Sequence, residues 1–408
     1  MSPHITILCP DLRSPSLGAA VRLRELLLPW AVDIVGPDFG GGVCSMYRHA
    51  GPFTVVPTNK LYRWPDFFWE SKKLEAAVRG RVVIALKAYM NTVPVALRLQ
   101  QAGQARAVVF LDEWDGAVLS ELSGWQRITR LLRQAHHPLE DSYYPMVERK
   151  IREAATVLST TTFLQKKFGG HVIAMGVDVS RFAPRPADVT VALRREMKLD
   201  GVRVIAFGGV VRPHKGVEQI LEALVRLGRH DVVLLVIGPI TEHLEFLMNQ
   251  PAYQSLIRVA GAPMKDAEGI NAAISQRMPD YLDLADLIVL PLIDNPLSRS
   301  QMPIKLFEAM TMAKPIIGSA VADLPRVLDG CGWTVPPGDG QKLAETIAYV
   351  LDHPDEAKTT GEAARAKCTN VYSRAVAGEK LKSILQPLLS DEGQPVMADL
   401  LQERGDIA

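Results

Sequence analysis

The chain has 408 residues and a net charge of +1, and hydrophobic residues make up 48% of it. This length is typical of two or three domains, and the apolar content is enough for sizeable cores, which argues against general disorder. The nearly balanced charge argues against a nucleic-acid binder driven by bulk charge. No apolar run approaches the roughly 18 residues of a membrane-spanning helix. The four cysteines fit neither a zinc site nor a disulfide framework. We therefore expect a cytoplasmic protein, for which peripheral contact with the inner face of a membrane stays open.

Short apolar runs alternate with helical patterns in the first part of the chain. Continuous apolar runs of this length are typical of parallel strands that are buried on both faces, and their alternation with helices predicts a doubly wound α/β domain. The predicted strands are 4–8, 32–35, 53–56, 82–86, 107–111 and 156–159, with helices at 18–28 and 91–102.

A second series of the same kind begins near residue 202. Its predicted strands are 203–207, 232–237, 257–259, 287–290, 315–318 and 333–335, and its helices are 216–227, 241–249, 303–312 and 340–352. In the first of these helices, one face is formed by Val217, Ile220, Leu221, Leu224 and Val225. The fold class is thus α/β with two domains in tandem. We expect the domains at 1–180 and 181–372, joined near 180–200, followed by a helix within 373–390 and a polar tail at 391–408.

Two motifs in the second domain are suited to binding an anion. The first, "GGVVRPHKG" at 208–216, lies between an apolar run and an amphipathic one and carries Arg212 and Lys215. The second, "PIKLFEAM" at 303–310, carries Lys305 near a predicted helix start. Backbone N–H groups and the helix dipole favour an anion at such a start, and fixed cations stabilise the charge on a departing diphosphate. These motifs predict an enzyme that cleaves a nucleotide sugar.

The segments around these motifs resemble the family 4 glycosyltransferases of the GT-B fold. The similarity is carried by "VIAFGGVVRPHKGVEQILEAL", "MPIKLFEAMTMAKPIIGSAVADLPRVL" and "GWTVPPGDGQKLAETIAYVL", in that order, and covers roughly 150–390. It implies two Rossmann-like domains that face a central cleft, with a final helix crossing back to the first domain. It also implies transfer of a sugar from a nucleotide-diphosphate-sugar donor to an acceptor hydroxyl, with retention of configuration. The acceptor class, whether carbohydrate, lipid or small molecule, is not indicated, nor is the oligomeric state.

The resemblance also assigns roles to single residues. Arg212 and Lys215 are expected to stabilise the diphosphate, and Glu308 to accept hydrogen bonds from the ribose hydroxyls, so these three are the candidate catalytic residues. The candidate donor-binding residues are Gly18, Gly209, Ser300, Gln301, Met302, Pro303 and Lys305. In many family members, two glutamates are separated by seven residues, but Ser300 stands here at the first of these positions. This departure puts the donor sugar and part of the mechanism in doubt.

A group of charged residues in the first domain follows two predicted strands. Asp112, Glu113 and Asp115 follow one strand, and Lys87 follows another, at the sheet edge where ligands of open α/β sheets gather. Asp112, Asp115 and Lys87 are therefore candidates on the acceptor side, although a helix cap for the acids and an ordinary surface lysine stay open. No His/Asp cluster has metal spacing, and cations already face the diphosphate. We expect no essential divalent ion and no cofactor beyond the co-substrate.

Two further segments and two rival functions remain open. The aromatic segment 62–69 suits a buried loop, or else acceptor recognition or a membrane interface. His136 and His137 are typical of a surface turn rather than of a ligand pair. One rival function is a nucleotide-sugar epimerase or a phosphorylase on the same fold, for which the sequence offers no acid–base pair. The other is a non-catalytic sugar-nucleotide-binding partner protein, which Ser300 favours and the intact cations oppose.

Overall fold

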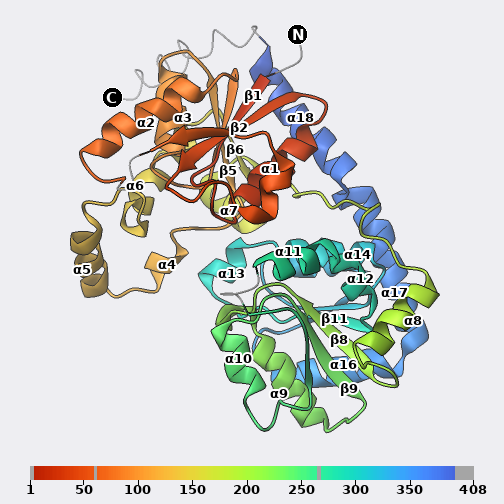
Figure 1. The fold of residues 1–408 in the computed structure, drawn as a ribbon. Coiled ribbons are helices and arrows are strands. Elements are labelled where there is room, and N and C mark those ends of the chain that lie inside the picture. The colour runs from red at the N-terminus through yellow and green to blue at the C-terminus, as the bar shows by residue number, and fades with distance from the viewer. Residues whose placement is uncertain (1–3, 59–61, 264–267, 391–408) are drawn as a thin grey trace, which may run out of the picture. The chain divides into compact units, whose positions relative to one another are not determined.

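The computed structural model describes residues 4–58, 62–263 and 268–390. The chain divides into two compact units. Unit 1 contains the chain up to Thr160, the segment Leu164–Ala174 and the chain from Ala377 on, and unit 2 contains Thr161–Phe163 and Met175–Val376. Each unit is an α/β structure built on its own sheet (Figure 1).

Unit 1 is built on a parallel sheet with the strand order β3-β2-β1-β4-β5-β6-β7. The strands are β1 (His4–Leu8), β2 (Ala31–Asp38), β3 (Thr54–Pro57), β4 (Val82–Leu86), β5 (Arg106–Leu111), β6 (Thr156–Ser159) and β7 (His171–Val172). Every residue of β4 is buried, as expected for a parallel strand with helices on both faces of its sheet. The predicted strands are confirmed with small shifts at their ends, whereas β7 was not predicted because two residues are too short a pattern.

The helices of unit 1 are α1 (Leu17–Leu27), α2 (Asp66–Ala77), α3 (Val93–Gln101), α4 (Ala117–Ser120), α5 (Gly124–Gln134), α6 (Tyr144–Glu148) and the greater part of α7 (Thr162–Phe168). The chain returns to unit 1 within α18 (Arg374–Leu389). Close packing accompanies this return, because a Cβ added to Gly378 would lie 2.6 Å from the carbonyl oxygen of Leu26 in α1. None of the described helices is both long enough and apolar enough to cross a bilayer.

Unit 2 is built on a second parallel sheet, with the strand order β10-β9-β8-β11-β12-β13. The strands are β8 (Arg203–Gly208), β9 (Val232–Ile237), β10 (Ile257–Ala260), β11 (Leu287–Leu290), β12 (Ile316–Ser319) and β13 (Trp333–Val335). The predicted strands of the second series are confirmed, and so is the α/β class with two parallel sheets.

The helices of unit 2 are α8 (Ala187–Glu196), α9 (Val217–Leu227), α10 (Glu242–Met248), α11 (Glu268–Gln276), α12 (Met278–Asp283), α13 (Pro296–Ser300), α14 (Ile304–Thr311), α15 (Leu324–Leu328), α16 (Gly340–Asp352) and α17 (Pro354–Lys367). In α9, the predicted apolar face is buried in the core at Val217 and Leu224, among others. Val225 was wrongly placed on this face, because it is 48% exposed and lies at the margin of the apolar stripe.

Two segments discussed from the sequence contain prolines. The first is the junction expected near 180–200, where 182–186 is irregular as the prolines suggested, α8 follows within unit 2, and the chain passes between units at Ala174. The second is the aromatic segment, which is only in part a loop, since Phe68 and Trp69 belong to α2 and are exposed while Phe67 is buried. In both cases a helix begins just after a proline, the position at which proline is tolerated in a helix.

Candidate functional site

The predicted anion-binding residues of unit 2 lie at the point where its strand order reverses. Successive strands run outward from β8 in one direction and from β11 in the other, and ligands of open α/β sheets bind beyond the carboxyl ends of the strands at such a point. The loop after β8 carries Arg212 and Lys215, and the segment after β11 leads to Gln301 and Lys305. The fold therefore brings together two motifs that are some ninety residues apart in sequence.

The loop after β8 adopts a backbone that requires glycine at two positions. Gly209 has φ of 125° and Gly216 has φ of 69°, both in the left-handed region that side chains disfavour. A Cβ added to Gly216 would lie 1.8 Å from the carbonyl oxygen of Pro291, directly after β11. Gly216 thus lets the two loops pack against each other. Arg212, which lies between the two glycines in sequence, is exposed.

A hydrogen bond between side chains joins the two loops at the candidate site. Nζ of Lys215 donates to Oε1 of Gln301 at 2.8 Å. The backbone N–H of Ile293 also donates to the carbonyl oxygen of His214, at 3.4 Å. His214 therefore contributes a backbone contact to the pairing of the two loops.

The start of α14 holds the other cation and the candidate ribose-binding carboxylate. Pro303 directly precedes the helix, and Nζ of Lys305 lies 2.8 Å from Oε2 of Glu308. Besides this ion pair, that oxygen accepts no hydrogen bond from the described residues, although Glu308 is only 8% exposed. A carboxylate oxygen has more than one lone pair, so it is able to accept a further hydrogen bond from a ligand hydroxyl.

Lys305 also reaches the end of β8. A Cβ built on Gly208 would lie 3.6 Å from Cδ of Lys305, so the lysine stem passes over the strand end that precedes Arg212. Lys215, through Gln301, and Lys305 thus lie near the N-terminus of α14 with the carboxylate of Glu308, and Arg212 is exposed on the same loop as Lys215. This charge balance and the helix dipole favour an anion such as a diphosphate.

Ser300 does not present its hydroxyl to this site. The residue is fully buried, and its Oγ donates to the carbonyl oxygen of Leu297 at 2.7 Å, within α13. The backbone oxygen of Ser300 accepts from Thr161 at 3.2 Å. A direct contact between this hydroxyl and a donor sugar therefore stays a prediction, as does donor binding by the neighbouring Met302.

In unit 1, the predicted acceptor-side residues form a single charged cluster. Nζ of Lys87 forms ion pairs with Asp112 at 3.3 Å and Asp115 at 3.4 Å, and with Glu113, which sequence reasoning named but did not select. Lys87 has φ of 63°, which directs the chain sharply away from the end of β4. The interpretation of Lys87 as an ordinary surface lysine is wrong, because its side chain is only 6% exposed.

Burial and charge shift the pKa values of this cluster. Burial alone would lower the pKa of Lys87, but the carboxylates of Asp112, Asp115 and Glu113 together hold it well above its usual value. Burial raises the pKa of Asp115 to about 6, an effect that Lys87 opposes and Glu113 reinforces. The cluster therefore holds a permanent cation and a carboxyl group that can exchange a proton near neutral pH.

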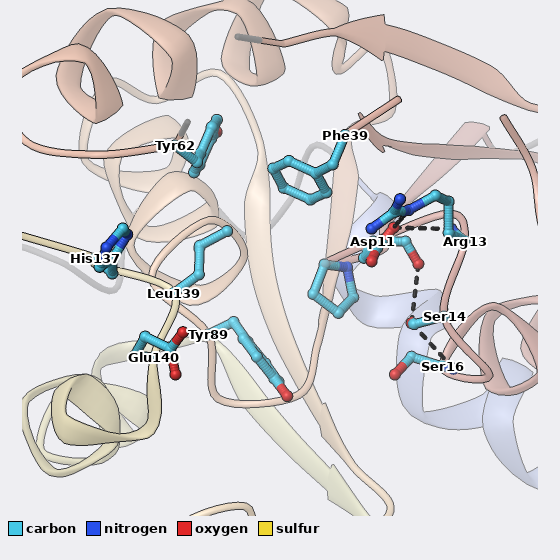
Figure 2. Close-up of a pocket in the computed structure, with 11 residues that line it drawn as sticks. Asp11, Arg13, Ser14, Ser16, Phe39, Tyr62, Tyr89, His137, Leu139 and Glu140 are labelled. Carbon is cyan, nitrogen blue, oxygen red and sulfur yellow. Dashed lines mark hydrogen bonds and ion pairs between the residues drawn. The ribbon is translucent and has the colours of Figure 1, made fainter. Parts of the chain in front are cut away.

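Beside this cluster, a pocket of about 420 Å³ opens at the switch point of unit 1, between β1 and β4. Figure 2 shows Asp11 and Arg13 on one side of it and Tyr89 and Glu140 on the other. A hydrogen bond joins the loop after β1 to the loop after β4, because Nδ2 of Asn91 donates to the carbonyl oxygen of Pro10 at 2.8 Å. The other residues that line the pocket are Pro10, Ser14, Ser16, Phe39, Tyr62, His137 and Leu139.

Sequence reasoning missed this pocket, although it selected the loop that follows β1. It singled out Gly18 in α1 for a close approach of the donor, but a Cβ there would lie 2.3 Å from the hydroxyl oxygen of Tyr47. The approach of a donor at Gly18 stays a prediction. The signal that could have found Asp11 and Tyr89 is their position directly after two predicted strands. His137, expected only in a surface turn, lines the pocket as well.

Comparison with known proteins agrees with this arrangement. Residues 201–353 match the family model for glycosyl transferases group 1. The chain is 25% identical over 278 residues to a GDP-mannose-dependent monoacylated alpha-(1-6)-phosphatidylinositol monomannoside mannosyltransferase of Corynebacterium glutamicum, covering 63% of this chain and 70% of the relative. It is 27% identical over 226 residues to the putative colanic acid biosynthesis glycosyltransferase WcaL of Escherichia coli, covering 53% of this chain and 51% of the relative.

A solved structure covers almost the whole chain. HepE of Anabaena, crystallised in complex with UDP, aligns over 94% of this chain and 100% of its own length, with a TM-score of 0.71 and 13% identity. At this identity the likeness concerns the fold. Residues 201–353 thus form a group 1 glycosyltransferase domain, in a chain whose two parallel sheets have the GT-B architecture of the glycosyltransferases.

Proposed function

We propose that this protein transfers a sugar from a nucleotide-diphosphate-sugar donor to an acceptor hydroxyl. The observation that carries the proposal is the position of Lys215 and Lys305 beside the start of α14, at the switch point of the sheet of unit 2, with Arg212 exposed on the same loop as Lys215. Two similar proteins support it: the relative from Corynebacterium is named as GDP-mannose-dependent, and HepE was crystallised in complex with UDP.

Each donor-side residue has a role that follows from its chemistry. Arg212 and Lys215 stabilise the negative charge that develops on the diphosphate as the glycosidic bond breaks. The buried carboxylate of Glu308 accepts hydrogen bonds from the ribose hydroxyls and is held in position by Lys305. The segment 301–303 and Gly209 contact the donor through backbone and side-chain groups.

Unit 1 supplies the acceptor site in this proposal. The pocket at its switch point is of the size that binds small ligands, and hydroxyls, a guanidinium and carboxylates line it. The cluster of Lys87, Asp112 and Asp115 orients the acceptor hydroxyl, and Asp115 is suited to proton exchange because its pKa is raised to about 6 by burial.

A ligand screen tests the donor class. Melting temperatures of the chain are measured with UDP, GDP, ADP, CMP and dTDP and their sugar conjugates, because a ligand at a hundredfold excess over its Kd stabilises the fold by about 2.7 kcal/mol. We expect a shift with one base, and its loss in Glu308→Gln, which keeps the side-chain size but cannot form the same pair of charged hydrogen bonds. If none of the nucleotides or nucleotide sugars raised the melting temperature, this would contradict the proposal.

The stereochemistry and the metal requirement are separate expectations. We propose attack from the face that the diphosphate leaves, with an oxygen of the leaving group helping to take the proton, so the anomeric configuration of the sugar is retained. We also propose that the cations replace a divalent ion at the diphosphate. NMR of the first product formed should show the donor's anomeric configuration, and EDTA should leave the initial rate unchanged. An inverted product, or a rate restored only by magnesium or manganese, would refute the respective expectation.

A second candidate is a non-catalytic nucleotide-sugar-binding partner. It is favoured by the burial of Ser300, whose hydroxyl donates to the carbonyl oxygen of Leu297 within α13. Binding of a nucleotide sugar without transfer or hydrolysis, under conditions in which unit 1 binds acceptor, would identify the protein as this partner. An epimerase on the same fold is distinguished by conversion of the nucleotide sugar in the absence of any acceptor.

A further inference from the structure

Helix α5 in unit 1 exposes the face that a helix ordinarily buries. Its sequence, GWQRITRLLRQ, places the large apolar side chains on one side and the arginines on the other. None of its residues is buried, and Trp125 is 73% and Leu132 is 71% exposed. Ile128 and Leu131 on the same face are each about half exposed, at 52% and 51%.

The polar face of α5 is the one that is attached to the protein. Nε of Arg130 donates to Oδ1 of Asp141 at 2.9 Å, and Asp141 is buried. Arg127 donates to the carbonyl oxygens of Leu122 at 3.1 Å and Ser120 at 3.3 Å. A cavity of about 460 Å³ against α4 and α6 is lined by both arginines and also by Leu131, at the margin of the apolar face. These two arginines therefore tie the helix to its neighbours, while Trp125, Ile128, Leu131 and Leu132 of the apolar face stay exposed.

The chemistry of this face selects its partner. Helices that lie in the plane of a membrane interface combine Trp and Leu on one face with Arg or Lys on the other, and anionic lipid headgroups attract the cations. Among its eleven residues α5 has three arginines and no acidic residue, and Arg133 is exposed. Trp125 has the amphipathic ring that is enriched at the level of the headgroups.

An exposed aromatic pair, Phe68 and Trp69, follows a loop that is hydrogen-bonded to the segment after α5. Phe68 and Trp69 of α2 are exposed, and Nζ of Lys72 lies 4.7 Å and 5.2 Å from their ring centroids. The loop before α2 is joined to the segment after α5, because the backbone N–H of Trp64 donates to the carbonyl oxygen of His136 at 3.1 Å. Unit 1 therefore carries two exposed sets of aromatic and cationic side chains on connected segments.

We propose that the apolar face of α5, formed by Trp125, Ile128, Leu131 and Leu132, docks onto the surface of an anionic phospholipid bilayer, with Phe68 and Trp69 as a second contact. Burial of this face in the headgroup region removes apolar area from water, and Arg133 meets the lipid phosphates. The inference is independent of the donor site of unit 2, so its failure would leave the proposed transfer reaction untouched.

The test uses the full chain and two kinds of vesicle. Co-sedimentation is measured with vesicles of phosphatidylcholine alone and of phosphatidylcholine with phosphatidylglycerol. We expect binding to the anionic vesicles and a decrease at high salt. The double variant Trp125→Ser/Leu132→Ser should bind at least about tenfold more weakly, because it lacks two apolar side chains that the bilayer would remove from water. Arg133→Gln should weaken binding to the anionic vesicles by about fivefold.

A matched variant and the melting temperature control for nonspecific effects. Phe246→Ser removes an apolar side chain of α10 in unit 2 that is 56% exposed, and it should bind like the unchanged protein. All these side chains are exposed, so the melting temperature should stay constant. The proposal would be overturned if the chain did not bind the anionic vesicles, or if the double variant bound them as tightly as the unchanged protein. A concentration-dependent dimer that the double variant disperses would also overturn it, because the face would then be covered by a second copy of the chain.

Discussion

Replacing Arg212 or Lys215 with methionine is expected to lower kcat for sugar transfer by about 10²–10³-fold. In the proposed reaction, both side chains stabilise charge that grows on the diphosphate only as the glycosidic bond breaks. An interaction that strengthens in the transition state lowers kcat when it is removed, whereas one of equal strength in the bound substrate changes KM. The effect on KM should therefore be smaller than that on kcat.

The two variants are expected to differ in one respect. Lys215 donates to Gln301 and so also joins the loop after β8 to the segment before α14, whereas Arg212 is exposed. Lys215→Met should therefore lower the melting temperature slightly as well as the rate. Initial rates are measured with the nucleotide sugar that stabilises the chain most.

An exposed arginine of the same unit provides the control. Arg226→Met, on the solvent side of α9, removes a cation without touching the loops and should leave kcat unchanged. If Arg212→Met and Lys215→Met were as active as Arg226→Met, the diphosphate would have to be held elsewhere. The role of the loop after β8 would then be limited to packing against the segment that follows β11.

The elements that carry the candidate donor residues were predictable from sequence because their signals are local. A buried strand, a loop with two glycines and two cations, and an amphipathic helix follow one another within 203–227, and each has a short-range physical cause. Parallel strands also end at a common edge of the sheet, so the identification of β8 and β11 was enough to bring the loops that follow them to the same edge.

The other features depend on contacts that no local pattern encodes. The pocket of unit 1 is lined by residues from separate loops, such as Asp11, Phe39 and His137, which only the folded chain brings together. The outward face of α5 was equally hidden, because an amphipathic pattern predicts a helix but not the side that faces the protein. The orientation of α5 depends on the contact between Arg130 and Asp141, two residues that lie in different helices.

Replacing Lys87 with methionine should destabilise unit 1 by about 3 kcal/mol near neutral pH. The lysine is 6% exposed and is the cation shared by Asp112, Glu113 and Asp115, so methionine keeps most of its volume but leaves three carboxylates close together. Removal of one partner from a buried ion pair costs about 3–5 kcal/mol. The lower end applies here because Asp112 and Glu113 are about 30% exposed and keep part of their hydration.

The destabilisation should grow as pH rises. In the folded protein burial raises the pKa of Asp115 to about 6 from its ordinary value of 3.8, so its protonated form favours folding, and this contribution is lost as pH rises through that window. Lys87 lowers this pKa, and its removal raises the pKa further, which makes the loss larger near neutral pH. Lys87 itself stays charged throughout this range because its own pKa is raised.

Urea unfolding near pH 5 and near pH 7.5 tests this expectation. The destabilisation by Lys87→Met should be smaller at the lower pH by about 1 kcal/mol, the equivalent of somewhat less than one pKa unit. Lys342→Met is the matched control, because its ion pair with Glu345 at 3.8 Å is more than half exposed on both sides and contributes about 0–1 kcal/mol. A loss of stability that is independent of pH would mean that lost packing, rather than unpaired carboxylates, causes the effect.

The double variant Lys87→Met/Asp115→Asn separates charge from packing. If unpaired carboxylates cause the loss, the second change should recover part of the stability, because it removes the most deeply buried of the three charges. If packing causes it, the two losses should add. Recovery of stability would also identify Lys87 as the group that keeps these carboxylates ionised and close together, the arrangement on which the proposed acceptor site depends.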